Sequence, residues 1–237
     1  MKKKKGLESV VTNLILVVIV FGLGFLAFAS NIKSVFNITN IEAIYRGNTE
    51  NNKISLMINV YWGTEFIEPM LNVLKENDVK ATFFVGGVWA SKNAEVLKQI
   101  FDAGHEIGNH GYYHKDHKLL SSDRNQEEIY ITHKLVKEIL GIDMVLFAPP
   151  SGSYNQTTLN VASNLGYKTI MWSKDTIDWR DKDSELCFSR ATKNAKSGEL
   201  ILMHPTEHTL KALPNIIKYY KENNFILTTV SENLSLD

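Results

Sequence analysis

Strand-like and helix-like segments alternate regularly along the chain from about Ile54 to its end. Short runs of β-branched and aromatic residues predict strands at 54–60, 81–86, 106–109, 144–148, 168–173, 199–203 and 225–230. Apolar residues at helical spacing predict helices at 64–77, 93–103, 126–140, 157–165, 184–195 and 209–223. This alternation favours parallel strands joined by right-handed crossovers. The fold class is therefore α/β, either a barrel of about seven or eight strands or a doubly wound sheet.

Composition limits the partners of the chain. Hydrophobic residues make up 44% and charged residues 22% of its 237 residues, which is typical of a globular protein. Lys and Arg together number 26, as do Asp and Glu, and this zero net charge argues against nucleic acid as a partner. The one cysteine, Cys187, excludes an intramolecular disulfide and is expected to be a buried apolar thiol.

The N-terminus differs from the rest of the chain. Four lysines precede an uncharged apolar run from Val10 to Ala29, which is long enough to cross a bilayer as a helix. The lysines predict a cytoplasmic N-terminus, so the remainder is expected outside the cytoplasm as a single-pass membrane protein. A signal peptide cleaved after Ala29 is the alternative, giving a secreted protein. We expect an anchor at 1–30, a linker at 31–52 and one domain at 53–237.

Histidines follow two of the predicted strands. His110 and His114 lie four residues apart after the third strand, a spacing that suits a shared divalent metal, with zinc the usual choice. His204 follows the sixth strand, and Asp178 lies in the loop after the fifth. Because ligands collect at the carboxyl ends of parallel strands, we expect these residues to meet, with Asp178 orienting His204 as a general acid.

Aromatic residues lie in the same loops. Tyr61 and Trp62 follow the first strand, and Trp179 follows Asp178. Such rings can form a wall for the face of a sugar. The alternative for each aromatic ring is that it packs in the core. The alternative for the histidines is that they form a surface cluster that binds no metal.

Five short motifs in order give the chain a resemblance to the polysaccharide deacetylases, carbohydrate esterases with a NodB homology domain. Residues 55–63 (SLMINVYWG) stand where the family commonly has T-F-D-D-G, and residues 80–85 (KATFFV) resemble the strand that follows it. Residues 110–114 (HGYYH) match H-[ST]-x-x-H except for Gly111. Residues 147–154 (FAPPSGSY), 175–179 (DTIDW) and 202–204 (LMH) stand at the R-x-P-Y-G, fourth and fifth motifs.

The resemblance implies a distorted (β/α) barrel of about seven strands and a metal-dependent hydrolase that removes N-acetyl groups from peptidoglycan or a related cell-wall glycan. It implies that His110 and His114 hold zinc or another divalent metal, and that His204 is the general acid, oriented by Asp178. It places Pro150 beside the substrate, together with the aromatic residues named above.

Three positions depart from the family pattern. Asn59 stands where the catalytic base is expected, and an amide cannot accept a proton at a useful pH. Tyr61, or Val60 in a shorter register, replaces the metal-binding aspartate, and Ala148 replaces the arginine that pairs with the base. Because general base catalysis contributes a factor of ~10² to 10⁴, hydrolysis is expected to be severely weakened or absent.

Two functions therefore remain open from the sequence. One is a cell-surface deacetylase whose ligand set is rebuilt by a nearby residue, with His105, Asp116, His117 and Glu65 as candidates. The other is a non-catalytic glycan-binding or scaffold pseudoenzyme that keeps the groove but not the chemistry.

Overall fold

A computed structural model describes residues 18–19, 21–22 and 41–236. The chain divides into two units, residues 1–40 and residues 41–237. The predicted membrane segment from Val10 to Ala29 lies almost entirely outside the described residues. Among the residues that are described, no helix has both the length and the apolar character needed to cross a membrane.

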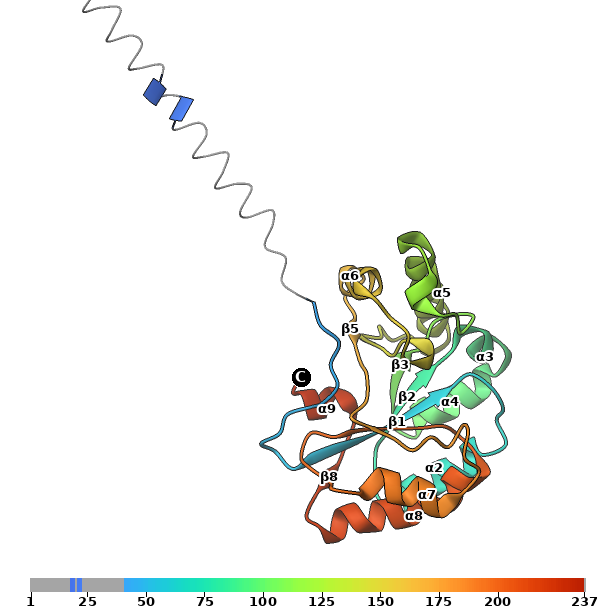
Figure 1. Ribbon diagram of the computed structural model, residues 1–237. Helices are drawn as coiled ribbons and strands as arrows, with labels where there is room; N and C mark the ends of the chain where they lie inside the picture. The colour runs from blue at the N-terminus through green and yellow to red at the C-terminus, as the bar shows by residue number, and fades with distance from the viewer. Residues whose placement is uncertain (1–17, 20, 23–40, 237) are drawn as a thin grey trace, which may run out of the picture. The chain divides into compact units, whose positions relative to one another are not determined.

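The second unit is built on a parallel sheet (Figure 1). Its strands are β1 (Lys53–Val60), β2 (Thr82–Val85), β3 (Glu106–Asn109), β4 (Leu146–Phe147), β5 (Lys168–Thr169), β6 (Lys174–Asp175), β7 (Leu200–Met203) and β8 (Ile226–Leu227). Seven strands run in the order β5-β4-β3-β2-β1-β7-β6, and β8 pairs with the start of β1. These seven strands form a curled half-barrel, and in the described sheet its end strands β5 and β6 do not pair with each other.

Helices cover the outside of the curled sheet. They are α2 (Ile67–Glu76), α3 (Gly87–Lys92), α4 (Ala94–Asp102), α5 (Ser122–Leu140), α6 (Gln156–Asn164), α7 (Ser184–Thr192), α8 (Glu207–Glu222) and α9 (Val230–Leu234), with short 3₁₀ turns η1 (His117–Leu119) and η2 (Pro150–Gly152). In Figure 1, α2, α7 and α8 lie together on one side of β1, and α5 and α6 lie together on the other. The predicted alternation of strands and helices is confirmed except between β5 and β6, which no helix separates.

The centre of the sheet explains why β1 has so few polar residues. Every residue from Ile54 to Val60 is buried, because β1 has strands on both sides and packed side chains on both faces. The registers Asn59↔Phe84 and Phe84↔Gly108 keep the carboxyl ends of β1, β2 and β3 level. The residues that follow these strands therefore emerge at one edge.

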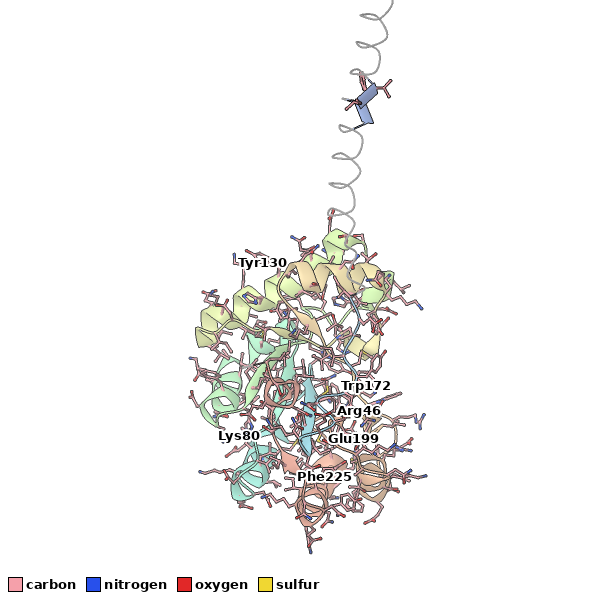
Figure 2. The ribbon with its side chains drawn as sticks, turned by 90° about the vertical axis from the view of Figure 1, so that its left-hand side faces the viewer. Arg46, Lys80, Tyr130, Trp172, Glu199 and Phe225 are labelled. Carbon is pink, nitrogen blue, oxygen red and sulfur yellow. The ribbon has the colours of Figure 1, made fainter. Side chains whose placement is uncertain are left out.

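The segment before β1 is hydrogen-bonded to the sheet. Ile44 forms a parallel bridge with Ile170 just beyond β5, and Arg46 forms an antiparallel bridge with Glu199 just before β7. The Arg46 guanidinium lies 3.6 Å from the buried carboxylate of Glu199, and the two are neighbours in Figure 2. Residues 44–46, which fall within the predicted linker at 31–52, thus reach from one side of the half-barrel to the other.

Three segments differ from the sequence-based prediction. Residues 168–173 were expected as one strand, but only Lys168 and Thr169 pair with β4, and Lys174 and Asp175 form the separate strand β6 beside β7. Residues 225–230 were expected as one strand, but only Ile226 and Leu227 pair with β1, and Val230 begins helix α9. The Thr229 hydroxyl accepts a hydrogen bond from the Glu232 N–H, an N-cap that starts the helix. Helix α3 was also missed, because its six residues include Gly87 and are too few to show a helical period.

Candidate functional site

Loops from three strands meet at the carboxyl edge of the sheet. Asn59 lies at the end of β1, His110 follows β3 and His204 follows β7. They share a cavity of about 300 Å³. Its lining residues are Asn59, Tyr61, His110, His114, Ser151, Trp172, Asp175, Trp179, Leu202 and His204.

The two histidines of the HGYYH motif are held as neutral imidazoles. The His110 ring is buried, and its Nδ1 lies 2.7 Å from the Ala148 carbonyl. Because a carbonyl only accepts, Nδ1 carries the proton and Nε2 keeps its lone pair. Burial lowers the pKa of both His110 and His114. The ring centroids are 5.1 Å apart, so the structure brings the two histidines together as the spacing predicts.

Tyr61 lies against these histidines. Its ring is stacked on His114, with centroids 3.6 Å apart and an interplanar angle of 20°. Its centroid is also 5.9 Å from that of His110 and 6.4 Å from that of His204. Burial, and then the charge of Asp178, raise the pKa of the Tyr61 phenol, which therefore stays protonated at neutral pH. A neutral phenol thus fills the space beside the imidazoles.

The predicted pair of Asp178 and His204 is present. His204 Nδ1 donates to Asp178 Oδ1 at 2.7 Å, and the His204 backbone N–H donates to Oδ2 at 2.6 Å. The Thr209 hydroxyl donates to the same Oδ2 at 2.5 Å. Burial alone would raise the pKa of Asp178, but its bonds to His204 and Thr209 lower it, so the carboxylate is ionised. The pair fixes the tautomer of His204 and leaves its Nε2 as the free ring nitrogen.

No proton acceptor stands at the position of the catalytic base. Asn59 is 3% exposed, and its Oδ1 has no hydrogen-bond partner among the described residues. Ala148, which is also buried, offers no guanidinium to pair with it. No Lys or Arg of the described chain lines the cavity. A group that could take a proton from water is missing at this position.

The donor set does not fit a resident zinc ion. Protein zinc sites use three or four nitrogen, sulfur or carboxylate ligands that converge on one point. The cavity lining includes His110, His114, His204 and Asp175, but position 61, beside His110 and His114, has a neutral phenol in place of a carboxylate. Within residues 41–236, no group of three or more His, Cys, Asp or Glu side chains is placed to hold a metal ion. The family motifs imply a metal site with a carboxylate ligand at position 61. This chain has Tyr61 there, and for that reason its ligand set differs from the one that the motifs imply.

None of the four candidate replacement ligands completes the set. His105 precedes β3 and so lies at the opposite end of that strand from His110. His117 Nδ1 is bonded to Asn125 Oδ1 at 2.7 Å, and its Nε2 has no partner among the described residues, but His117 does not line the cavity. Asp116 caps the η1 turn. Glu65 is exposed and accepts from the backbone N–H of Thr64.

The predicted sugar-binding residues fall into two groups. Tyr61 and Trp179 line the cavity, and Trp179 is 56% exposed at its mouth. Trp62 packs beside His204, with ring centroids 5.3 Å apart, and Pro150 is buried in η2, so neither contributes to the lining. Sequence reasoning missed Trp172, because it lies inside the predicted strand 168–173, whereas in the structure it lies between β5 and β6.

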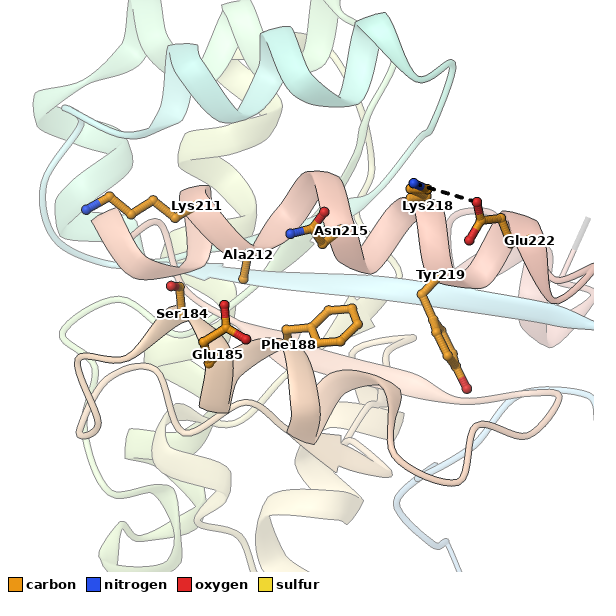
Figure 3. A pocket seen from close by; sticks show the side chains of 9 residues that line it. All are labelled: Ser184, Glu185, Phe188, Lys211, Ala212, Asn215, Lys218, Tyr219 and Glu222. Atoms are coloured by element: carbon orange, nitrogen blue, oxygen red, sulfur yellow. Dashed lines mark ion pairs between the residues drawn. The ribbon is translucent and has the colours of Figure 1, made fainter.

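A second groove lies between α7 and α8 (Figure 3). Phe188 and Tyr219 form its apolar part, and Lys218 and Glu222 form an ion pair at its edge. It contains no histidine and lies on the helices outside the sheet, so it has no part in the site described above.

Comparison with known proteins agrees with this arrangement. The family model described as polysaccharide deacetylase matches residues 46–170. The chain belongs to the polysaccharide deacetylase family. Members of this family are hydrolases that act on N-acetyl groups, and solved members share the fold described above.

Relatives include both named deacetylases and a pseudoenzyme. A peptidoglycan-N-acetylglucosamine deacetylase of Bacillus cereus is 34% identical over 70% of this chain and 80% of its own length. The Bacillus subtilis protein YlxY is 38% identical over 81% of this chain, which spans 60% of that relative. The crystal structure of a CE4 family pseudoenzyme from Bacillus anthracis is 37% identical, covers 82% of this chain and 69% of its own, and superposes with a TM-score of 0.80.

A variant of that pseudoenzyme has also been solved. It is described as a mutant with restored enzymatic activity, is 36% identical to this chain and has a TM-score of 0.80. It covers 82% of this chain and 71% of its own.

Proposed function

We propose that this protein is a glycan-binding pseudoenzyme of the polysaccharide deacetylase family, acting on the outer side of the cell membrane on peptidoglycan or a related cell-wall glycan. The stacking of Tyr61 on His114 carries the proposal. Tyr61 replaces a charged metal ligand with a neutral phenol, and its ring occupies the space beside His114 and His110 in which a metal-binding carboxylate would stand. The kinship with a CE4 pseudoenzyme supports this assignment.

Loss of the base and loss of the metal ligand are independent defects. Asn59 cannot accept a proton, which removes a factor of about 10² to 10⁴ in rate by itself. Without a metal, no Lewis acid polarises the acetamide carbonyl. The retained aromatic rings still provide a surface on which a sugar can stack.

Weak residual hydrolysis is the second candidate function. One observation favours it: His204 and Asp178 keep the geometry of a general acid and its orienting carboxylate. A general acid alone protonates a leaving amine but does not generate the attacking hydroxide, so this activity depends on a water activated by another group.

The test combines zinc binding with deacetylation. Calorimetric titration of zinc into the full-length protein is expected to show only weak binding that is unchanged in His110→Ala. The variant Asn59→Asp/Tyr61→Asp/Ala148→Arg is expected to gain submicromolar zinc binding and to release acetate from N-acetylglucosamine oligomers. Tight zinc binding by the parent that is lost in His110→Ala, or acetate release by the parent, would show that the proposal is wrong.

A further inference from the structure

The cavity carries an uncompensated carboxylate. Asp175, the second residue of β6, lines it, and its Oδ1 accepts a hydrogen bond from the Ile177 N–H at 2.7 Å. Its other oxygen has no hydrogen bond within the described residues, and no ion pair reaches it. The nearby Arg190 is bonded to the Thr176 carbonyl and to Asp181. Burial, and then the neighbouring charge of Asp178, raise the pKa of the Asp175 carboxyl, and a bound cation would offset both effects, so this carboxylate is placed to pair with a cationic ligand.

Aromatic rings surround the same space. Tyr61, Trp172 and Trp179 line the cavity with Asp175. The faces of aromatic rings attract cations, and the attraction is stronger where water is displaced. Rings together with a carboxylate are a setting that favours an ammonium group over a neutral amide.

The remaining polar atoms in the cavity also need donors. His110 Nε2 holds a lone pair, because Nδ1 donates to Ala148. Asn59, nine-tenths buried or more, has an Oδ1 without a partner in the described structure. A primary ammonium has three donors and a positive charge. An acetamide has one N–H donor and a carbonyl that would need a metal or donors of its own.

We propose that the cavity binds the free primary ammonium of a de-N-acetylated amino sugar, in preference to the N-acetylated sugar. This inference rests on the proposed glycan-binding function and specifies its ligand. The protein would thus recognise glycan strands that an active deacetylase has already modified. The same amine chemistry also occurs in lysine side chains, but these lack a sugar face to stack on Trp179.

The experiment compares matched ligands. The full-length protein is titrated calorimetrically at pH 6 with the β-1,4-linked tetramer of glucosamine and with the tetramer of N-acetylglucosamine. Because hydrogen bonds to charged groups are worth about 1.5–3 kcal/mol, the glucosamine tetramer is expected to bind at least about tenfold more tightly. Nα-acetyl-lysine amide is expected to bind far more weakly than either tetramer binds.

Asp175→Asn is the matched variant, because its amide oxygen can still accept from the Ile177 N–H. It is expected to lose the preference for glucosamine while its affinity for the N-acetylated tetramer stays within about twofold. Asp123→Asn, which removes an exposed carboxylate on α5, is the control and should keep the preference.

The outcomes separate the two proposals. Equal or tighter binding of the N-acetylated tetramer overturns the amine preference and leaves glycan binding intact. Failure of both tetramers to bind overturns glycan binding, and the amine preference with it. Tight binding of the lysine derivative shows that the cavity recognises an amine without a sugar, which also overturns the inference. These comparisons use the wild-type protein, so they hold even if Asp175→Asn does not fold.

Discussion

The buried carboxylate of Asp178 should be one of the most important single groups for the stability of this domain. It is 1% exposed and accepts three hydrogen bonds, two from His204 and one from Thr209. Asp178→Ala leaves all three donors without their acceptor. Breaking a buried charged pair in this way costs about 3–5 kcal/mol. For a domain of this size, each kcal/mol lowers the Tm by about 2–4 °C, so a fall of roughly 6–20 °C is expected.

Asp178→Asn should cost much less. Its amide oxygen can accept from the His204 backbone and Thr209, and its NH₂ group can donate to Nδ1 if the imidazole changes tautomer. The expected cost is about 1–2 kcal/mol. The two variants are compared by urea unfolding at pH 7, with Glu50→Ala as an exposed control outside the helices that should change stability by less than about 0.5 kcal/mol.

The effect of Asp178 should depend on pH. Because the folded-state pKa of Asp178 lies below that of the unfolded chain, its charge stabilises the fold above about pH 4. This stabilisation is lost as the pH falls through the folded-state pKa, so the difference between wild type and Asp178→Asn should shrink at pH 3. Equal stability of wild type and Asp178→Ala at pH 7, or a difference that grows in acid, would refute this account of the pair.

Three further predictions concern other parts of the domain. Gly111 has φ +70°, and a Cβ there would lie 3.0 Å from His117 Nε2. Gly111→Ala should therefore lower the free energy of unfolding in urea by about 1–3 kcal/mol. An unchanged unfolding midpoint would show that the alanine is not strained at this position. The Ser121 hydroxyl caps α5 through the Arg124 N–H, and Ser121→Ala should cost about 1 kcal/mol, whereas Ser121→Gly should cost only a few tenths. Burial raises the pKa of the Cys187 thiol to about 11, so it should not react with a disulfide reagent at pH 8 until the protein unfolds; fast reaction of the native protein would show that the thiol is accessible.

The order of the elements could be predicted because their periodicity is local. The buried run in β1 and the helical spacing in α2 are each visible within about ten residues of sequence. The short β6 and the end of β8 could not be predicted in the same way. Lys174 and Asp175 pair with β7 residues that follow them by 27 positions, and nothing in their own sequence indicates that pairing.

The site was partly predictable for the same reason. His110, His114, Asp178 and His204 follow predicted strands, so parallel topology was enough to bring them to one edge. The stacking of Tyr61 on His114 depends on a side-chain conformation and on the backbone of the HGYYH loop, where His114 has φ 54°. The tyrosine at position 61 indicated that a metal ligand is missing. It did not indicate that the tyrosine ring would stack on His114.

The bridges of Ile44 and Arg46 have a practical consequence for preparing this domain. A shortened protein that begins at Lys53 would keep all eight strands but would lose the backbone partners of Ile170 and Glu199. Unpaired N–H and C=O groups beside a sheet are templates for pairing with another chain. Such a protein is expected to self-associate in solution. A protein that begins at Ile41 keeps the segment that pairs with Ile170 and Glu199 and is expected to stay dispersed.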